Sequence, residues 1–296
     1  PTLNQVSSFS VPSVGKFELN GWMVIDSTGE NLYWAASSLI GDIYKVQLSN
    51  GSNSLLFSSK ERINGISLAG DDNSIFVSDG TMVNQYDITD SPGQKILQCP
   101  VKSSTVGDIA VSGSDLVWSD SSTGTVYDCL VDCSNCNTSS VVDSGLPSCS
   151  PWQFITVSGS EVYNQYGCGG IVRAEIDGSG DPVQLKHQGL DPIADLIVHS
   201  SALMWALPYR YELLRADVTD NSIGQTETLY SGTGTFTNLI ANDGAFYWID
   251  AEAAKIMQAS AGSSPNNIVY QPAVGLAYIC LYSCILQFIL THLFRF

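Results

Sequence analysis

Residues 247–250 read Tyr-Trp-Ile-Asp, and this short stretch decides the fold because versions of it recur along the chain. Residues 117–120 read Val-Trp-Ser-Asp and residues 76–79 read Phe-Val-Ser-Asp. The second residue of the apolar or aromatic pair recurs every 41 to 45 residues, at Trp34, Val77, Trp118, Tyr163, Trp205 and Trp248. A regular period of this length indicates tandem structural units.

Each unit contains four short apolar segments separated by turns of Gly, Ser, Asp and Asn. In the first unit, the segments are Trp22–Ile25, the stretch around Tyr33-Trp34, Asp42–Leu48 and Ser54–Ser58. Sustained apolar periodicity of 3.6 residues is missing, so helices are minor. Four short strands per unit are typical of propeller blades. The sequence therefore predicts an all-β, six-bladed β-propeller with four antiparallel strands per blade.

The predicted propeller spans residues 1–272 and is followed by a hydrophobic tail at 273–296. The blades are expected near residues 20–60, 63–100, 106–145, 151–189, 193–232 and 236–272. Residues 5–11 form a further apolar segment, which is a candidate to pair with the last blade and close the ring. Closure would remove most free strand edges.

The repeated stretch resembles the Tyr-Trp-Thr-Asp motif of six-bladed propellers of the low-density-lipoprotein-receptor type, and NHL-like repeats are similar in pattern. Gly41-Asp42-Ile43-Tyr44 and Gly124-Thr125-Val126-Tyr127 resemble that family's third strand. The resemblance implies an extracellular binding propeller whose motif Asp braces the blades. Ala36, Gln165 and Leu207 replace that Asp in the first, fourth and fifth units, which puts bracing there in doubt.

Composition narrows the possible functions. With 12 basic and 29 acidic residues, the formal charge is −17, which argues against binding a nucleic-acid backbone or an anionic lipid surface. The chain lacks the phosphate-binding, dinucleotide-binding, nucleophile-elbow and zinc-protease motifs. We therefore expect a non-catalytic protein that binds a protein or glycan partner through one rim, with a structural tile of a surface assembly as an alternative.

The cysteine content of the chain indicates disulfides and therefore an oxidising compartment. Six disulfide candidates lie in the predicted propeller: Cys99, Cys129, Cys133, Cys136, Cys149 and Cys168. Cys149 with Cys168, and Cys133 with Cys136, are possible pairs from blade topology. A zinc site from Cys129, Cys133 and Cys136 is the alternative, although its spacing matches paired knuckles poorly.

Two further features bear on localisation. Asn50 and Asn137 begin glycosylation sequons. The tail at 273–296 is long and apolar enough to span a bilayer, and it is open to three interpretations: a membrane helix, a lipid-anchor signal or an artefact of gene prediction. Together with the cysteines, these features predict an extracellular or cell-surface protein.

Polar residues begin some of the predicted inner strands. Alignment on the last apolar residue makes these positions equivalent: Trp22, Ile66, Asp108, Phe154, Asp195 and Asn238. Asp108, Asp195 and Asn238 would then face the central channel, where oxygen ligands suit Ca²⁺. Calcium-dependent lactonase-like propellers are similar, so a channel-metal hydrolase is the enzymatic alternative. Hydrogen bonding between blades is the simpler role for these residues.

Aromatic residues mark the rim that carries the links between blades. Trp22, Trp152, Tyr166, Tyr209 and Tyr211 fall at or near these links and the second loops. Exposed aromatic rings suit peptide or sugar recognition, whereas packing between blades is the structural alternative.

Overall fold

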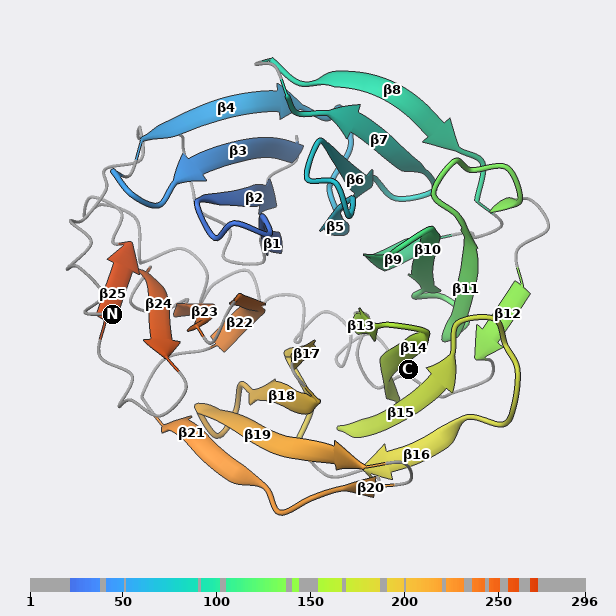
Figure 1. The fold of residues 1–296 in the computed structure, drawn as a ribbon, viewed down its shortest axis with the longest axis vertical. Helices are drawn as coiled ribbons and strands as arrows, with labels where there is room; N and C mark the ends of the chain where they lie inside the picture. Colours follow the sequence, from blue (N-terminus) through green and yellow to red (C-terminus); the bar gives the residue numbers. More distant parts are fainter. Residues whose placement is uncertain are drawn as a thin grey trace, which may run out of the picture.

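In the computed structural model, β-strands are arranged as blades around a central axis (Figure 1). It describes residues 22–37, 41–50, 52–89, 92–101, 105–136, 140–143, 154–166, 169–186, 191–199, 201–219, 222–231, 236–242, 245–250, 255–260 and 267–270. The predicted closing strand at 5–11 and the tail at 273–296 lie outside these residues.

Within the described ranges, the strands form six antiparallel sheets, each from consecutive segments of the chain. The innermost strands are β1 (Trp22–Ile25), β5 (Gly65–Leu68), β9 (Val106–Ser112), β13 (Ile155–Ser158), β17 (Asp195–His199) and β22 (Phe236–Asn242). The second strands are β2 (Asn31–Ser37), β6 (Ser74–Ser78), β10 (Asp115–Asp120), β14 (Glu161–Tyr166), β18 (Ala202–Leu207) and β23 (Ala245–Asp250).

The outer half of each sheet follows the same order. The third strands are β3 (Gly41–Gln47), β7 (Val83–Asp87), β11 (Thr125–Leu130), β15 (Gly170–Glu175), β19 (Glu212–Thr219) and β24 (Lys255–Ser260). The outermost strands are β4 (Asn53–Ser58), β8 (Gln94–Cys99), β12 (Ser140–Asp143), β16 (Val183–Lys186), β21 (Glu227–Ser231) and β25 (Asn267–Tyr270). The fifth sheet adds β20 (Ser222–Ile223), which pairs with the end of β19. The predicted all-β propeller of four-stranded antiparallel sheets is confirmed.

The pairing of the third strand with the fourth contains a register shift in every sheet that the structure describes. In the first sheet it lies between Ile43 and Tyr44, and in the third between Val126 and Tyr127. An irregularity of this kind increases the local twist of a strand pair. Its recurrence at the same strand pair shows that the six sheets share one local geometry.

The innermost strands contact one another in a closed circle. β1 contacts β5 and β22, and β13 contacts β9 and β17, while the remaining contacts join β5 to β9 and β17 to β22. The first and sixth sheets are therefore neighbours although they lie at opposite ends of the described chain. Asn242 Nδ2 donates a hydrogen bond of 3.1 Å to the Asp26 carbonyl oxygen across this junction.

Apolar side chains fill the spaces between consecutive sheets. Separate buried clusters join the first sheet to the second, the second to the third, the third to the fourth, the fourth to the fifth and the fifth to the sixth. Trp118, Trp205 and Trp248 are fully buried in these clusters. Trp34 is instead partly exposed and stacks on Tyr44 with ring centroids 4.6 Å apart. The repeated aromatic pair thus anchors the packing of one sheet on the next.

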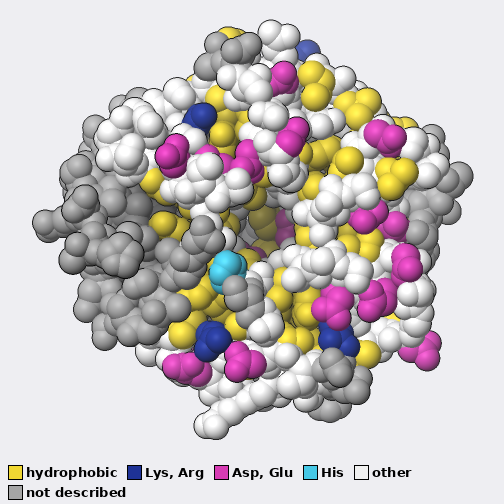
Figure 2. All heavy atoms as spheres, in the orientation of Figure 1, with side chains coloured by type: hydrophobic (Ala, Val, Ile, Leu, Met, Phe, Trp, Pro, Cys, Tyr) yellow, Lys and Arg dark blue, Asp and Glu magenta, His cyan; other side chains and the backbone are white. Residues whose placement is uncertain are grey.

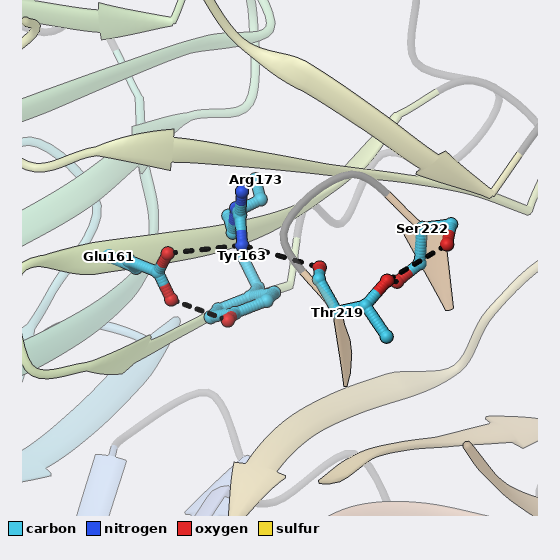
Figure 3. Close-up of polar contacts among 5 residues, drawn as sticks. All are labelled: Glu161, Tyr163, Arg173, Thr219 and Ser222. Carbon is cyan, nitrogen blue, oxygen red and sulfur yellow. Dashed lines mark hydrogen bonds and ion pairs between the residues drawn. The ribbon is translucent and has the colours of Figure 1, made fainter. Parts of the chain in front are cut away.

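The ring has two rims with different connections. We call the rim with the first-to-second and third-to-fourth strand turns the turn rim, and the rim with the second-to-third turns and the links between sheets the link rim. On the turn rim, Arg173 of β15 forms an ion pair with Glu161 at 3.2 Å and donates to the Thr219 carbonyl oxygen at 3.5 Å (Figure 3). Glu161 also accepts a hydrogen bond from Tyr163 at 2.7 Å. These contacts connect the fourth sheet to the β19–β20 hairpin of the fifth.

Gly65 sits where two innermost strands come closest together. A Cβ atom built on Gly65 would lie 2.9 Å from the backbone nitrogen of Ile109 and 3.0 Å from Asp108 Oδ1. The close approach of β5 to β9 therefore requires a residue without a side chain.

We predict that Gly65→Ala lowers the free energy of unfolding by about 1–3 kcal/mol, because the new methyl group would push the second and third sheets apart. Chemical denaturation measures this change. Gly70→Ala is the matched control, since nothing lies within 4 Å of a Cβ at Gly70, and its stability should stay within about 0.5 kcal/mol of the parent. Equal stability of both variants would contradict the close approach.

Candidate functional site

Asp108, Asp195 and Asn238 all lie on innermost strands and are all buried. Ile109 pairs with Trp118 and Leu196 pairs with Trp205, so each Asp precedes the residue opposite the repeated Trp. The register thus makes Asp108 and Asp195 equivalent, as the sequence predicted.

The same register corrects the predicted alignment in two sheets. Ile66 pairs with Val77, so Gly65 rather than Ile66 is the equivalent of Asp108 in the second sheet. In the fourth sheet Thr156 pairs with Tyr163, which makes Ile155 rather than Phe154 the equivalent residue. Alignment on apolar residues failed here because a buried Gly occupies one position and an apolar residue the other.

Both channel carboxylates accept backbone hydrogen bonds in the same pattern. Asp108 Oδ1 accepts from the N–H of Ile109 at 2.9 Å, and its Oδ2 accepts from the N–H of Ile155 at 3.1 Å. Ile155 belongs to β13, the innermost strand of the next sheet. Each oxygen therefore satisfies a backbone donor, and one of the two bonds crosses between sheets.

Asp195 repeats this arrangement two sheets further on. Its Oδ1 accepts from the N–H of Leu196 at 2.7 Å, and its Oδ2 accepts from the N–H of Leu239 on β22 at 2.5 Å. The two carboxylates thus join the third sheet to the fourth and the fifth sheet to the sixth. Each Asp thus links two neighbouring sheets through a hydrogen bond at the centre of the ring.

Burial dominates the electrostatics of both carboxyl groups. Burial raises the pKa of Asp195 to about 7, against the lowering effect of the N–H donors of Leu239 and Leu196. Burial also raises the pKa of Asp108 well above its usual value, and the charge of Asp195 adds to this rise, whereas the N–H donors of Ile155 and Ile109 lower it.

Asn238 differs from the two Asp residues in its backbone. Its φ of 58° lies in the left-handed region, which Asn tolerates better than most residues. It falls within the register shift between Thr237 and Ile240 in the β22–β23 pair. The backbone of Asn238 therefore accommodates the irregularity in the pairing of β22 with β23.

Calcium binding by Asp108, Asp195 and Asn238 stays a prediction. Among the residues that the structure describes, Cys99, Cys133 and Cys136 are the one group of three His, Cys, Asp or Glu ligands placed close enough together to hold a metal. Asp108 and Asp195 belong to no such group in those residues.

We predict that the parent protein loses stability as pH rises from about 4 to about 7, relative to Asp195→Asn. A folded-state pKa above the unfolded value means that the folded state binds the proton more tightly. This contribution is fully present below the unfolded pKa and disappears as pH passes the folded pKa. Denaturation of both proteins at several pH values measures the free energy of unfolding. From the size of the pKa shift, we expect the difference between the two proteins to change by about a few kcal/mol over this range.

Asp177→Asn is the control for the pH experiment. Asp177 is exposed, and hydrogen bonds from Ser179 lower its pKa, so its removal should leave the slope between pH 4 and pH 7 unchanged. Parallel pH curves for the parent and Asp195→Asn would show that Asp195 is not the group responsible.

Trp22 and Phe154 meet across the central channel. Their ring centroids are 5.7 Å apart with the planes tilted by 49°. Trp22 begins β1 and Phe154 precedes β13, and these strands are not neighbours in the circle of innermost strands. Figure 2 shows a hollow at the centre of one face, with hydrophobic side chains in it and Asp and Glu side chains around the face. Trp22, predicted on the binding rim, is thus a partly buried residue at the centre of the ring, and its contact with Phe154 could not be predicted from local sequence.

Tyr209 and Tyr211 lie on the link rim in the turn between β18 and β19. Tyr209 is 77% exposed and Tyr211 is 37% exposed. Arg210 between them forms an ion pair with Asp191, in the link that leads to β17, at 2.5 Å. Tyr211 has a φ of 56°, and the N–H of Arg210 donates to the Leu207 carbonyl oxygen at 3.2 Å. The turn therefore holds an exposed aromatic side chain on an anchored backbone.

Some predicted residues fall where the structure gives no description. Trp152, Asn137, Cys149 and Cys168 lie outside the described residues, and nothing is described of the Tyr166 side chain. Asn50, the other sequon residue, is exposed in the β3–β4 turn. Glycosylation at both sequons stays a prediction.

Four cysteines form two disulfides at the junction of the second and third sheets. Cys99 pairs with Cys133 with Cα atoms 5.1 Å apart, and Cys129 pairs with Cys136 with Cα atoms 4.9 Å apart. The predicted pair of Cys133 with Cys136 is therefore wrong. Spacing favoured it, but β8 places Cys99 beside the turn that follows β11, and only the fold shows that proximity.

The motif aspartates cap turns. Asp120 is buried, and its Oδ1 accepts hydrogen bonds from the N–H of Ser122 at 2.8 Å and of Thr123 at 3.3 Å. Asp79 Oδ2 accepts from Asn84 Nδ2 at 2.6 Å. These bonds fix second-to-third strand turns on the link rim, so the motif shapes the rim on which Tyr209 also lies.

This ring of twisted antiparallel sheets defines the class of protein as a β-propeller. No protein-family model matches the chain, and no curated protein matches it. Among solved structures it is similar to a chain in a crystal structure of a nidogen/laminin complex, with a TM-score of 0.56 and 15% sequence identity. The match covers 69% of this chain and 78% of that chain. At this identity the likeness shows the shared fold.

Among the described residues, no helix is long and apolar enough to cross a bilayer. The paired cysteines are typical of proteins that fold outside the cytosol. Anchoring through the tail at 273–296 stays a prediction.

Proposed function

We propose that this protein is a six-bladed propeller of the Tyr-Trp-Thr-Asp type that acts outside the cell or at its surface and binds a protein partner through the link rim. The exposed Tyr209 is the observation that carries the proposal. Its side chain is 77% exposed on a turn tied to the neighbouring link by the Arg210–Asp191 ion pair.

The chemistry of this turn favours a protein partner. Tyr and Arg are enriched among the residues that contribute most to protein–protein affinity. A Tyr side chain buries a large area while losing little rotational freedom, because it has only two side-chain torsions. Since the backbone of the turn is already anchored, little further ordering is needed on binding.

The similar chain in the nidogen/laminin complex supports a binding role, because that structure contains a propeller-like chain in a complex of proteins. The disulfides support an extracellular setting. The recurring motif aspartates support the Tyr-Trp-Thr-Asp type, since they cap link-rim turns in the second and third sheets.

We predict that Tyr209→Ser weakens binding to the partner by about tenfold or more, because the exposed ring would be lost from the contact. The measurement is surface plasmon resonance of the full chain against a panel of purified secreted proteins, cell-surface ectodomains and glycans. If only glycans bind, the proposed protein partner is wrong and the ligand is a sugar.

Ile96→Ser is the matched control for this experiment. Ile96 is 55% exposed but lies on β8, the outermost strand of the second sheet, away from the rim turns. It should bind like the parent. A partner that binds Tyr209→Ser and the parent equally, but loses affinity for Ile96→Ser, would contradict a link-rim site.

A further inference from the structure

The sulfur atoms of four cysteines gather in one place between the second and third sheets. Cys99 ends β8, Cys129 lies near the end of β11, and Cys133 and Cys136 lie in the turn that follows. The sulfur atoms of Cys99, Cys133 and Cys136 lie within 4.8 Å of one another, and Cys129 is bonded to Cys136. One compact group of four sulfur atoms thus belongs to two different sheets.

This group has the composition of a structural zinc site. Zinc in such sites takes four ligands in a tetrahedron with Zn–S bonds of about 2.3 Å, which places the sulfur atoms about 3.8 Å apart. Cys133 and Cys136 have the C-x2-C spacing of a zinc knuckle, and Cys129 precedes Cys133 by a similar interval. The sequence alone offered three ligands in one blade, and the fold brings the fourth, Cys99, from the neighbouring sheet.

We propose that the reduced form of this four-cysteine cluster binds one zinc ion, so that the second and third sheets can be joined there either by disulfides or by metal. Reduction breaks two S–S bonds and takes up four electrons and four protons: two equivalents of a phosphine supply the electrons and become phosphine oxide, while two water molecules supply the oxygen and the protons. Binding of Zn²⁺ by the four resulting thiols then releases up to four protons as four Zn–S bonds form.

The surroundings of the cluster favour a soft metal and a defined route of reduction. Cys99, Cys129 and Cys136 are buried in the apolar cluster with Phe76 and Leu116. Thiolate ligands select zinc over hard cations such as calcium. Cys133 is more exposed than the other three cysteines, so its sulfur is the one that a reductant reaches first.

The test uses the full chain, reduced by a phosphine without oxygen and titrated with Co²⁺ and then Zn²⁺. We expect one equivalent of Co²⁺ to give the absorption of a tetrahedral tetrathiolate complex, which one equivalent of Zn²⁺ then removes. Failure of the reduced protein to bind one equivalent, whether it stays folded or unfolds, overturns the proposal.

Three variants test which cysteines bind the metal. Cys99→Ser should weaken cobalt binding by more than about tenfold, because only three sulfur ligands remain. Cys99→His should restore binding with an altered spectrum, because His is a zinc ligand but cannot form the disulfide. The double variant Cys149→Ser with Cys168→Ser is the control and should bind like the parent. Equal binding by Cys99→Ser and the parent would show that Cys99 is not a ligand and would overturn the proposal.

Discussion

The second to fifth sheets each pack apolar side chains on both faces, and burial of these faces between neighbouring sheets holds the ring together. A four-stranded sheet cannot shield two apolar faces by itself, but a circle of sheets shields each face with the next sheet. The buried clusters between consecutive sheets and the circle of contacts among the innermost strands are the direct result. The recurring irregularity between the third and fourth strands increases the local twist of each strand pair.

Polar groups at the centre of the ring follow from the same constraint. Backbone N–H groups at the starts of innermost strands face buried surroundings and need acceptors. Asp108 and Asp195 provide them across two junctions, at the cost of two carboxyl groups with raised pKa values. At the same centre Trp22 meets Phe154, with ring centroids 5.7 Å apart. The rim turns carry exposed residues that differ from one turn to the next, such as Tyr209. Turns of this kind are suited to recognition.

The sequence predicted the fold well because the repeat is periodic and local. The aromatic pair, the turn residues and the spacing all describe one sheet, and sheets of one kind pack in few ways. Features that depend on contacts between sheets were missed. Spacing favoured a bond between Cys133 and Cys136, whereas the fold brings Cys99 to Cys133 from another sheet. Likewise, Gly65 carries no apolar signal, and the meeting of Trp22 with Phe154 spans more than half of the described chain.

Native-state hydrogen exchange distinguishes a closed ring from an open row of sheets. In an open row of repeats the terminal units unfold first, whereas a closed circle has no terminal unit. For a closed ring we expect the paired amides of β1 and β22, at the junction of the first and sixth sheets, to exchange only through the same global unfolding as those of β9 and β13. Exchange of β1 and β22 at a much lower free energy than β9 and β13 would contradict it.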